Sequence, residues 1–291
     1  MDTPAEKTQV AWQPLTPQGV AAFARGPLRR LFLVQLVFAL LAAATAVWTL
    51  HHAWFPVFEQ AISQLPPQGQ IRFSKLDWRG DSPARLAENP LLAFSVDLTH
   101  SRQARSPAHV QVEFGQYDVR IFSLFGFLQG RYPPGWRMAF NRVELEPWWG
   151  AWVPELLACS AGSVLAGLIV IWAILATLHS LPAWLIGFFA NRDLSLGGSW
   201  RLSGAALLPG ALFLTAAIFL YGLGLLDLVR LLVAAGAHLV IGWVYLVVSP
   251  LALPRYPGVS GAKRNPFARE DPRPAQPAGE PPHAGTNETG S

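Results

Sequence analysis

His238 is the one ionisable residue deep within a long apolar run of this chain, so it is the first candidate for chemistry. An ionisable side chain at membrane depth is costly to bury and commonly serves proton transfer or ligand contact. The alternative is a neutral imidazole that hydrogen-bonds to a neighbouring helix, and Ala234 and Gly242, one turn away on either side, allow such a close contact. We expect this packing role, because no second ionisable residue lies in the core of any apolar run.

A predicted β-hairpin is the clearest local structure outside these runs. Segments 110–114 and 117–121 alternate apolar and polar residues and flank Gly115-Gln116, a pair that suits a two-residue turn. This register places Val112 on the face toward the core and Gln111 on the exposed face. Further strands are predicted at residues 70–73, 92–98 and 137–144.

The hairpin also supplies a second candidate for chemistry, because its register sets Glu113 opposite Asp118. Like charges directly opposite each other are unfavourable. A bound cation would relieve the repulsion, and so would the neighbouring Arg120. The sequence contains no HExxH, Walker A, GxSxG or CxxC pattern. We therefore expect no enzyme activity, no cofactor and no bound metal ion.

The composition indicates a membrane protein. Charged residues make up 14% of the chain, against about 25% in an ordinary soluble domain. The single cysteine, Cys159, lies within an apolar run, so no internal disulfide is possible. The basic residues form no stripe interleaved with aromatic residues, which argues against nucleic-acid binding.

Four apolar runs account for this composition. Each reaches the roughly 20 residues that a helix needs to cross a hydrocarbon core. They are Leu31–Leu50, Leu156–Leu178, Leu202–Leu226 and Leu228–Leu253. The polar stretch 51–150 is too long for a loop without structure of its own. We predict an integral membrane α-helical bundle of four spans, with a small, mainly antiparallel β (α+β) extracytoplasmic domain inserted between spans 1 and 2.

Arginines near the ends of the runs predict the orientation, because short cytoplasmic segments are enriched in Arg and Lys. Arg29 and Arg30 precede the first run, and Arg192 and Arg201 separate the second from the third. Both termini are therefore expected in the cytoplasm. The predicted order is a cytoplasmic segment (1–30), span 1 (31–50) with a helical stalk to about residue 65, the extracytoplasmic domain (51–150), span 2 (153–178), a cytoplasmic loop with an interfacial helix (179–201), span 3 (202–226), span 4 (228–253) and a disordered cytoplasmic tail (254–291).

Three segments leave alternatives open or rest on short patterns. The first run follows a twin-arginine-like sequence, so it is either an uncleaved anchor, which we expect, or a cleaved export signal. Segment 181–190 is too short to span. It is predicted as an interfacial helix or a bent extension of span 2 through Pro182, with a re-entrant hairpin and a fifth span as the remaining alternative. Segment 20–28 is predicted to lie along the inner membrane surface.

Small residues predict where helices pack closely. Ala158, Gly162 and Ala166 recur at four-residue spacing along span 2, and such residues let two helix backbones approach. Gly210, next to Pro209 in span 3, indicates a kink that is stabilised by neighbouring helices. These four positions, Ala158, Gly162, Ala166 and Gly210, are the predicted helix contacts.

Tyr132-Pro-Pro-Gly-Trp136 and the segment Asn141–Trp149 stand just before span 2, and with this layout the chain resembles bacterial inner-membrane families of unknown function. The resemblance implies a location in the bacterial inner membrane, with one N-terminal span, an extracytoplasmic domain and a compact helical bundle, and it transfers no functional residue. We expect a non-enzymatic docking, sensing or scaffold protein that acts through its extracytoplasmic domain. Expected partners are the lipid bilayer, other membrane or periplasmic proteins, or a second copy of the chain. The alternative is a small transporter or transporter subunit that uses His238.

Overall fold

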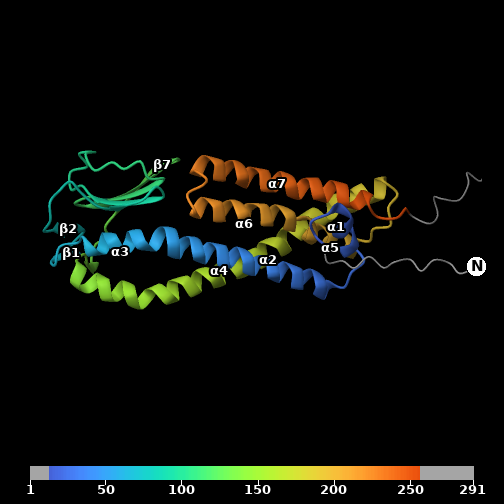
Figure 1. Cartoon of the computed structure of the whole chain (residues 1–291), viewed down its shortest axis with the longest axis horizontal. Helices are drawn as coiled ribbons and strands as arrows, with labels where there is room; N and C mark the ends of the chain where they lie inside the picture. Colours follow the sequence, from blue (N-terminus) through green and yellow to red (C-terminus); the bar gives the residue numbers. More distant parts are fainter. Residues whose placement is uncertain (1–12, 256–291) are drawn as a thin grey trace, which may run out of the picture. The chain divides into compact units, whose positions relative to one another are not determined.

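The described residues, 13–255 of a computed structural model, form a helical bundle and a sheet domain (Figure 1). The bundle consists of α1 (Pro17–Phe23), α2 (Leu28–Thr49), α4 (Arg142–Phe189), α5 (Leu196–Ala206), α6 (Leu208–Gly222) and α7 (Leu228–Leu251). The sheet domain, residues 64–141, holds strands β1 to β8 and packs on α3 (Phe55–Ser63). The predicted tail lies outside the described residues from Tyr256 onward.

Four helical segments of the described chain are long and apolar enough to cross a membrane. They are Leu28–Ser63, Arg142–Phe189, Leu196–Gly222 and Leu228–Leu251. In the first, α2 continues through a π-helical turn, η1 (Leu50–Trp54), into α3, so the predicted stalk is helical to Ser63. In the third, α5 and α6 are separated at Leu207, because Pro209 fits the first turn of a helix but not its interior.

A side-chain cap sets the beginning of α4. The Oδ1 atom of Asn141 accepts a hydrogen bond from the backbone N–H of Glu144 at 3.0 Å, which starts the helix at Arg142. The strand predicted at 137–144 is therefore too long. Only β8 (Arg137–Ala139) is extended, and the remaining residues belong to the cap and the first turn of the helix.

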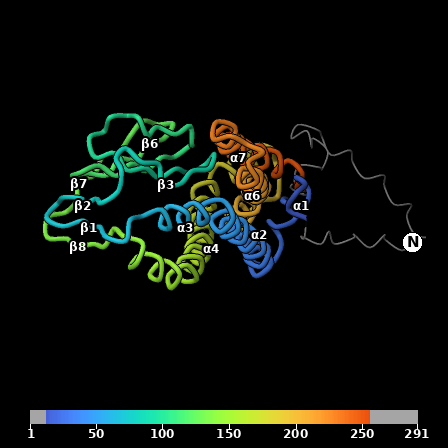
Figure 2. Tube along the Cα trace, turned by 60° about the vertical axis from the view of Figure 1, so that its left-hand side comes forward, coloured from blue at the N-terminus to red at the C-terminus, as the bar shows by residue number. Residues whose placement is uncertain are grey.

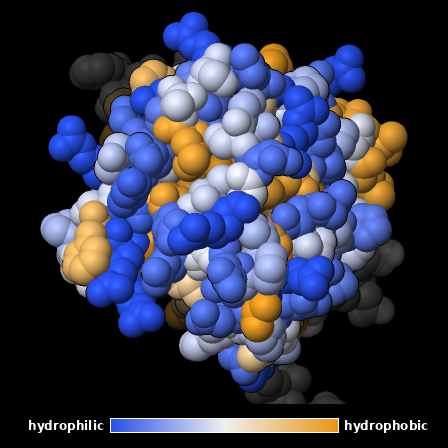
Figure 3. Space-filling view, turned by 90° about the vertical axis from the view of Figure 1, so that its left-hand side faces the viewer, coloured by the Kyte–Doolittle hydropathy of each residue, from blue (hydrophilic) through white to orange (hydrophobic). Residues whose placement is uncertain are grey.

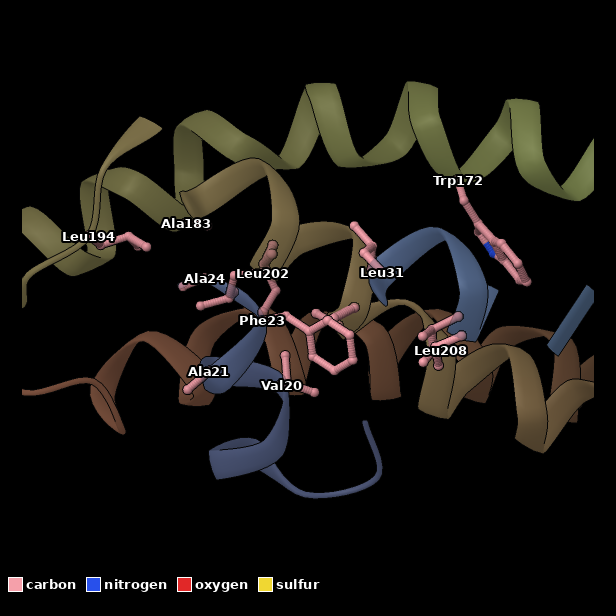
Figure 4. Close-up of a cluster of buried hydrophobic side chains, with 14 of the residues drawn as sticks. Val20, Ala21, Phe23, Ala24, Leu31, Trp172, Ala183, Leu194, Leu202 and Leu208 are labelled. Atoms are coloured by element: carbon pink, nitrogen blue, oxygen red, sulfur yellow. The ribbon is translucent and has the colours of Figure 1, made fainter. Parts of the chain in front are cut away.

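Two segments that were expected at the membrane surface are part of the bundle. Segment 181–190 continues α4 as far as Phe189, which corresponds to the extension of span 2 and not to a separate helix. Segment 20–28 was predicted to lie along the membrane surface, but Val20 and Phe23 of α1 are buried in the bundle core (Figure 4). The apolar side of α1, which was expected to face lipid, instead packs on α5 and α7, and the position of this segment relative to the membrane stays a prediction.

In the described residues, eight strands form two sheets at the end of α3 that lies away from α1 (Figure 2). An antiparallel sheet has the order β2-β1-β8, with β1 at Gly69–Arg72 and β2 at Lys75–Trp78. A second sheet has the order β3-β4-β5-β6-β7, formed by Ala84–Glu88, Leu92–Val96, Val110–Phe114, Asp118–Ser123 and Gly126–Arg131. Strands β4 and β5 run parallel and the other described pairs antiparallel, so the domain is mixed.

The predicted hairpin is present as β5 and β6, but its register is shifted by two residues. Val112 pairs with Ile121, and the turn residues are Gln116-Tyr117, because the Gly115 N–H donates to the Asp118 carbonyl oxygen at 2.8 Å. An even shift keeps the same side chains on each face of the sheet. The apolar face of the hairpin therefore still packs on the domain core.

The connection between the parallel strands β4 and β5 buries the face that the sequence prediction left exposed. Parallel neighbours need a crossover, which here is formed by residues 97–109. Under it, the Nε2 atom of Gln111 donates a hydrogen bond to the Ala104 carbonyl oxygen at 2.8 Å. Gln111 and Glu113 are each only 2% exposed. The prediction that only Val112 faces a core is therefore wrong, since both faces of β5 are covered.

Candidate functional site

The crossover begins with a loop that is held by the carboxylate of Asp97. Its Oδ2 atom accepts hydrogen bonds from Ser101 Oγ at 2.9 Å and from the Arg102 N–H at 3.0 Å, and its Oδ1 atom accepts two from Thr99 at 3.3 Å. Burial alone would raise the pKa of Asp97, but these hydrogen bonds outweigh burial and hold the pKa below its ordinary value of 3.8. The fixed loop places His100, in the left-handed region at a φ of 55°, over the sheet.

His100 connects two buried carboxylates. Its Nδ1 atom lies 2.6 Å from Glu113 Oε1, and its Nε2 atom lies 2.7 Å from Asp118 Oδ1. The side chains of His100, Glu113 and Asp118 are 16%, 2% and 9% exposed. An imidazole donates from both nitrogens only when it carries both protons, so the geometry fits an imidazolium between two carboxylates. Charge-assisted hydrogen bonds of this kind are stronger than neutral ones.

Two further side chains complete this group, which we call the His100 cluster: His100, Glu113, Asp118, Arg120 and Gln129. Gln129 Nε2 donates a hydrogen bond to Asp118 Oδ2, and Arg120 Nε lies 3.6 Å from the same oxygen, an ion pair that is too long for a hydrogen bond. Glu113 and Arg120 are cross-strand partners. Glu113 Oε2 and Arg120 Nε are buried and have no hydrogen-bond partner among the described residues, so the cluster has one free acceptor and one free donor.

A cavity of about 630 Å³ opens beside the His100 cluster. Its polar lining includes Ser74, His100, Gln116, Asp118, Gln129 and Arg131. The hydroxyl of Tyr132, also in the lining, donates a hydrogen bond to the Gly115 carbonyl oxygen at 3.0 Å. Burial, and then the charge of Asp118, raises the pKa of Tyr132, which keeps this hydroxyl protonated as a donor. The end of the sheet domain that faces away from the bundle is mostly hydrophilic (Figure 3), so a polar ligand suits this domain.

The geometry of the cluster favours binding over proton-transfer chemistry. Both ring nitrogens of His100 hold carboxylates, so neither can accept a proton from a ligand without losing a charged hydrogen bond. The ring also lies between Glu113 and Asp118, and its nitrogens point to opposite sides. Among residues 13–255, no group of three or more His, Cys, Asp or Glu side chains is arranged to hold a metal ion. The group that lies between the two acids, where the sequence left a bound ion or Arg120, is the imidazole of His100.

His100 is the residue that the sequence reasoning missed. It lies 13 residues before Glu113 and 18 before Asp118, in a loop without periodicity. One available signal was Asp97, followed by Thr99 and Ser101, because an aspartate before such residues is typical of a turn closed by its side chain. That signal predicts a tight loop, but it does not say which strand the loop covers.

His238, the candidate of the sequence analysis, lines a second cavity between α2, α4, α6 and α7, with a volume of about 560 Å³. Its Nδ1 atom donates a hydrogen bond to the carbonyl oxygen of Ala235 in the same helix. His179 of α4 also lines this cavity, and its ring meets the Trp243 ring edge-on at 5.0 Å between centroids. The sequence reasoning missed His179 because it directly follows the second apolar run.

Of the four predicted packing positions, Gly210 lies at a close helix contact. A Cβ atom there would collide with the His238 carbonyl oxygen, so α6 and α7 approach where only glycine fits. Ala158, Gly162 and Ala166 are exposed on α4, and a Cβ at Gly162 would meet nothing within 4 Å. The structure thus brings Gly210 and His238 together, while contacts at the other three positions stay a prediction.

Known proteins do not identify the chain. Comparison with protein-family models, with curated proteins and with solved structures finds no match. The resemblance to bacterial inner-membrane families is one of layout and stays a prediction. The geometry of the two cavities is therefore the basis for a functional proposal.

Proposed function

We propose that this chain is a non-enzymatic, four-span protein of the bacterial inner membrane whose sheet domain, outside the cytoplasm, binds a small polar ligand with an acidic group, as a sensing or docking component. The observation that carries the proposal is the cavity beside the His100 cluster. Arg131 lines this cavity, and its guanidinium has no ion-pair partner among the described residues. Arginine binds carboxylate and phosphate groups through two parallel hydrogen bonds. Ser74, Gln116 and Gln129 supply neutral polar contacts around it.

The arginines of the bundle support cytoplasmic termini. Arg25 forms an ion pair with Asp193 at 2.8 Å, close to the first apolar helix. Arg192 and Arg201 donate to backbone carbonyl oxygens at 2.7 and 2.8 Å, in segments that lie near the two ends of the described chain. Short segments rich in arginine stay on the cytoplasmic side. An even number of spans then returns the chain to the side where it began.

The hairpin of β6 and β7 supports a bilayer surface at the beginning of α7. Its turn residues Leu124 and Phe125 are 55% and 80% exposed, which is costly in water. Leu124 lines a surface cavity together with Asp227 and Val229, and β7 lies near this end of α7 (Figure 1). Exposed apolar residues next to a membrane helix favour contact with the headgroup layer. In this proposal the hairpin rests on the bilayer, while the His100 cavity opens to water.

Thermal-shift measurements on the full chain in detergent micelles test the ligand site. The probes are glutamate, lactate and glucose 6-phosphate, with glucose as the uncharged control. Arg131→Gln is the test variant, and Arg137→Gln is the matched control because Arg137 lines a different cavity. We expect an acidic probe to stabilise the protein, with affinity at least about tenfold weaker in Arg131→Gln and unchanged in Arg137→Gln. Folded protein that no acidic probe stabilises, or equal effects of the two variants, contradicts the proposal.

A small transporter is the second candidate, because His238 and His179 both line the cavity in the bundle. Intramembrane ionisable residues at a cavity are typical of solute or proton pathways. Affinity purification from the native host and flux assays in liposomes separate the two functions. Partners that copurify in stoichiometric amounts support docking, whereas solute flux by the pure protein supports transport.

A further inference from the structure

We propose that the cavity between α2, α4, α6 and α7 binds a single-chain amphiphile from the bilayer whose head carries an O–H group. This inference rests on the proposed four spans and concerns a site distinct from that of the sheet domain. The cavity volume of about 560 Å³ lies in the range of small-molecule sites. Its wall is mostly apolar, and its polar groups include Thr45, His179, Thr215 and His238. Such a wall accommodates an apolar body and orients one polar end.

The cavity opens sideways between helices. Ile171 on α4 and Leu239 and Trp243 on α7 line it, and they are 50%, 58% and 49% exposed. In a bilayer, this opening faces acyl chains instead of water. A ligand with an alkyl chain therefore reaches the cavity from the membrane, and the exposed lining residues contact hydrocarbon both before and after binding.

Two polar side chains of the cavity, His238 and Thr215, donate hydrogen bonds to backbone carbonyl oxygens and keep a lone pair that can accept another. A carbonyl oxygen only accepts, so the Nδ1 atom of His238 carries the hydrogen that it donates to Ala235. In the neutral imidazole, Nε2 is then an acceptor. The Thr215 hydroxyl donates to the Ala211 carbonyl oxygen at 2.8 Å, and its oxygen likewise keeps a lone pair.

Acceptors in hydrocarbon need a donor, because no bulk water is present to supply one. An alcohol or a protonated carboxylic acid supplies an O–H hydrogen, whereas an ether or an ester does not. Thr45 and His179 line the same cavity and each carries a hydrogen that it can donate, and the Nδ1 atom of His179 is buried without a hydrogen-bond partner among the described residues. A head group that both donates and accepts, as an O–H group does, therefore fits these groups better than an ether or an ester, which only accepts, while the apolar wall selects the chain. A phospholipid with two chains and only ester and phosphodiester oxygens fits less well on both counts.

Photolabelling of the full chain in phosphatidylcholine nanodiscs tests this site. The probe is hexadecanol with a diazirine in its chain, and the matched probe is the methyl ether of the same molecule. Peptide mapping after irradiation is expected to show alcohol label on the α4 and α7 residues that line the cavity. Ether label there is expected to be about fivefold lower, the change that corresponds to one lost hydrogen bond.

Two glycines of α7 give a matched pair of variants. A Cβ at Gly242 would meet only Leu207 Cδ2, at 3.8 Å, so Gly242→Leu directs its side chain into free space at the cavity. A Cβ at Gly236, which is exposed and does not line the cavity, would meet nothing within 4 Å. Gly242→Leu is expected to abolish the cavity label and Gly236→Leu to leave it unchanged. Should Gly242→Leu misfold by near-UV circular dichroism, His238→Leu replaces it, with an expected loss of about fivefold.

The results separate this inference from the proposed function. Equal cavity labelling by alcohol and ether, or unchanged labelling in folded Gly242→Leu, overturns it. Reporter fusions after residues 100, 195, 227 and 260 measure the topology independently. Four spans without selective labelling refute the amphiphile site alone, whereas a different number of spans refutes the membrane layout on which it rests.

Discussion

Removing the imidazole of His100 is the most direct test of the ion cluster in the sheet domain. The substitution His100→Ala leaves Glu113 and Asp118, which are 2% and 9% exposed, without the cation that they share. Removing one partner of a buried ion pair costs about 3–5 kcal/mol, because the remaining charge is buried and unpaired. His100 is 16% exposed, and Arg120 lies 3.6 Å from Asp118, so water and Arg120 compensate in part. The expected loss of opening free energy is therefore near the lower end, about 3 kcal/mol.

A double variant separates the charge of the cluster from its packing. Glu113→Gln in the His100→Ala background removes one uncompensated charge and keeps nearly the same side-chain volume. We expect it to restore about 1–2 kcal/mol of the loss. Gln129→Ala is the control, since it removes only a neutral donor to Asp118 and is expected to cost about 1 kcal/mol.

Hydrogen exchange of the full chain in micelles provides the assay. Mass spectrometry of peptides from β5 and β6 gives the free energy of opening for this part of the sheet domain. The reasoning is refuted if His100→Ala costs less than about 1 kcal/mol. It is equally refuted if the double variant is no more stable than the single one, since the loss would then come from loop packing and not from charge.

Three further predictions concern the sheet domain. The folded-state pKa of Asp97 lies below 3.8, so the stabilisation by this carboxylate is present above that pH and is lost as the pH falls through the lowered value. Acid and the substitution Asp97→Asn should therefore both increase proteolysis of the loop after β4, and an Asp97→Asn loop that is as resistant as the wild type at neutral pH contradicts this. Gln111→Asp and Val112→Asp are both expected to raise protease sensitivity, because both faces of β5 are covered, and a harmless Gln111→Asp would mean that the crossover opens freely. A nitroxide at position 125, in a background without the native cysteine, should be more accessible to oxygen dissolved in lipid than one at position 73, although the side chains of Phe125 and Phe73 are 80% and 76% exposed. If the two labels are equally accessible to oxygen, the hairpin lies away from the bilayer.

Hydropathy was sufficient to predict the long helices but not their ends. A membrane-crossing helix must be apolar along nearly its whole length, so the runs are visible in composition alone. The ends are set by single side chains. Asn141 caps α4 and shortens a predicted strand, and Ser195 caps α5 several residues before the apolar run that begins at Leu202. The burial of Phe23 depends on α5 and α7, which are distant in sequence, so its own pattern did not distinguish a protein core from a membrane surface.

The sheet shows a different limit. Alternation identified β5 and β6, and it also identified the face formed by Val112 and its neighbours. It left Gln111 and Glu113 on a face that was assumed to be open, because polar residues usually mark solvent. The crossover after β4 covers that face. Its backbone hydrogen-bonds to the Gln111 side chain, which accepts from the Ser106 N–H and donates to the Ala104 carbonyl oxygen. Whether a polar face is wet or covered depends on the parallel pairing of β4 with β5, which no local pattern encodes.

The role of His238 likewise depends on what surrounds it and not on its local sequence pattern. The substitution His238→Gln can distinguish ligand binding, proton transfer and packing. The glutamine amide oxygen accepts a hydrogen bond as Nε2 does, but glutamine does not titrate near neutral pH. If His238 orients an O–H head group, His238→Gln should retain most of the cavity label, and His238→Leu should lose about fivefold. If His238 relays protons in a transporter, glutamine should abolish flux in liposomes while the protein stays folded. If both variants keep full labelling and normal abundance, His238 has only the packing role predicted from the sequence, next to Gly210. The amphiphile then binds without a hydrogen bond from its O–H group to His238.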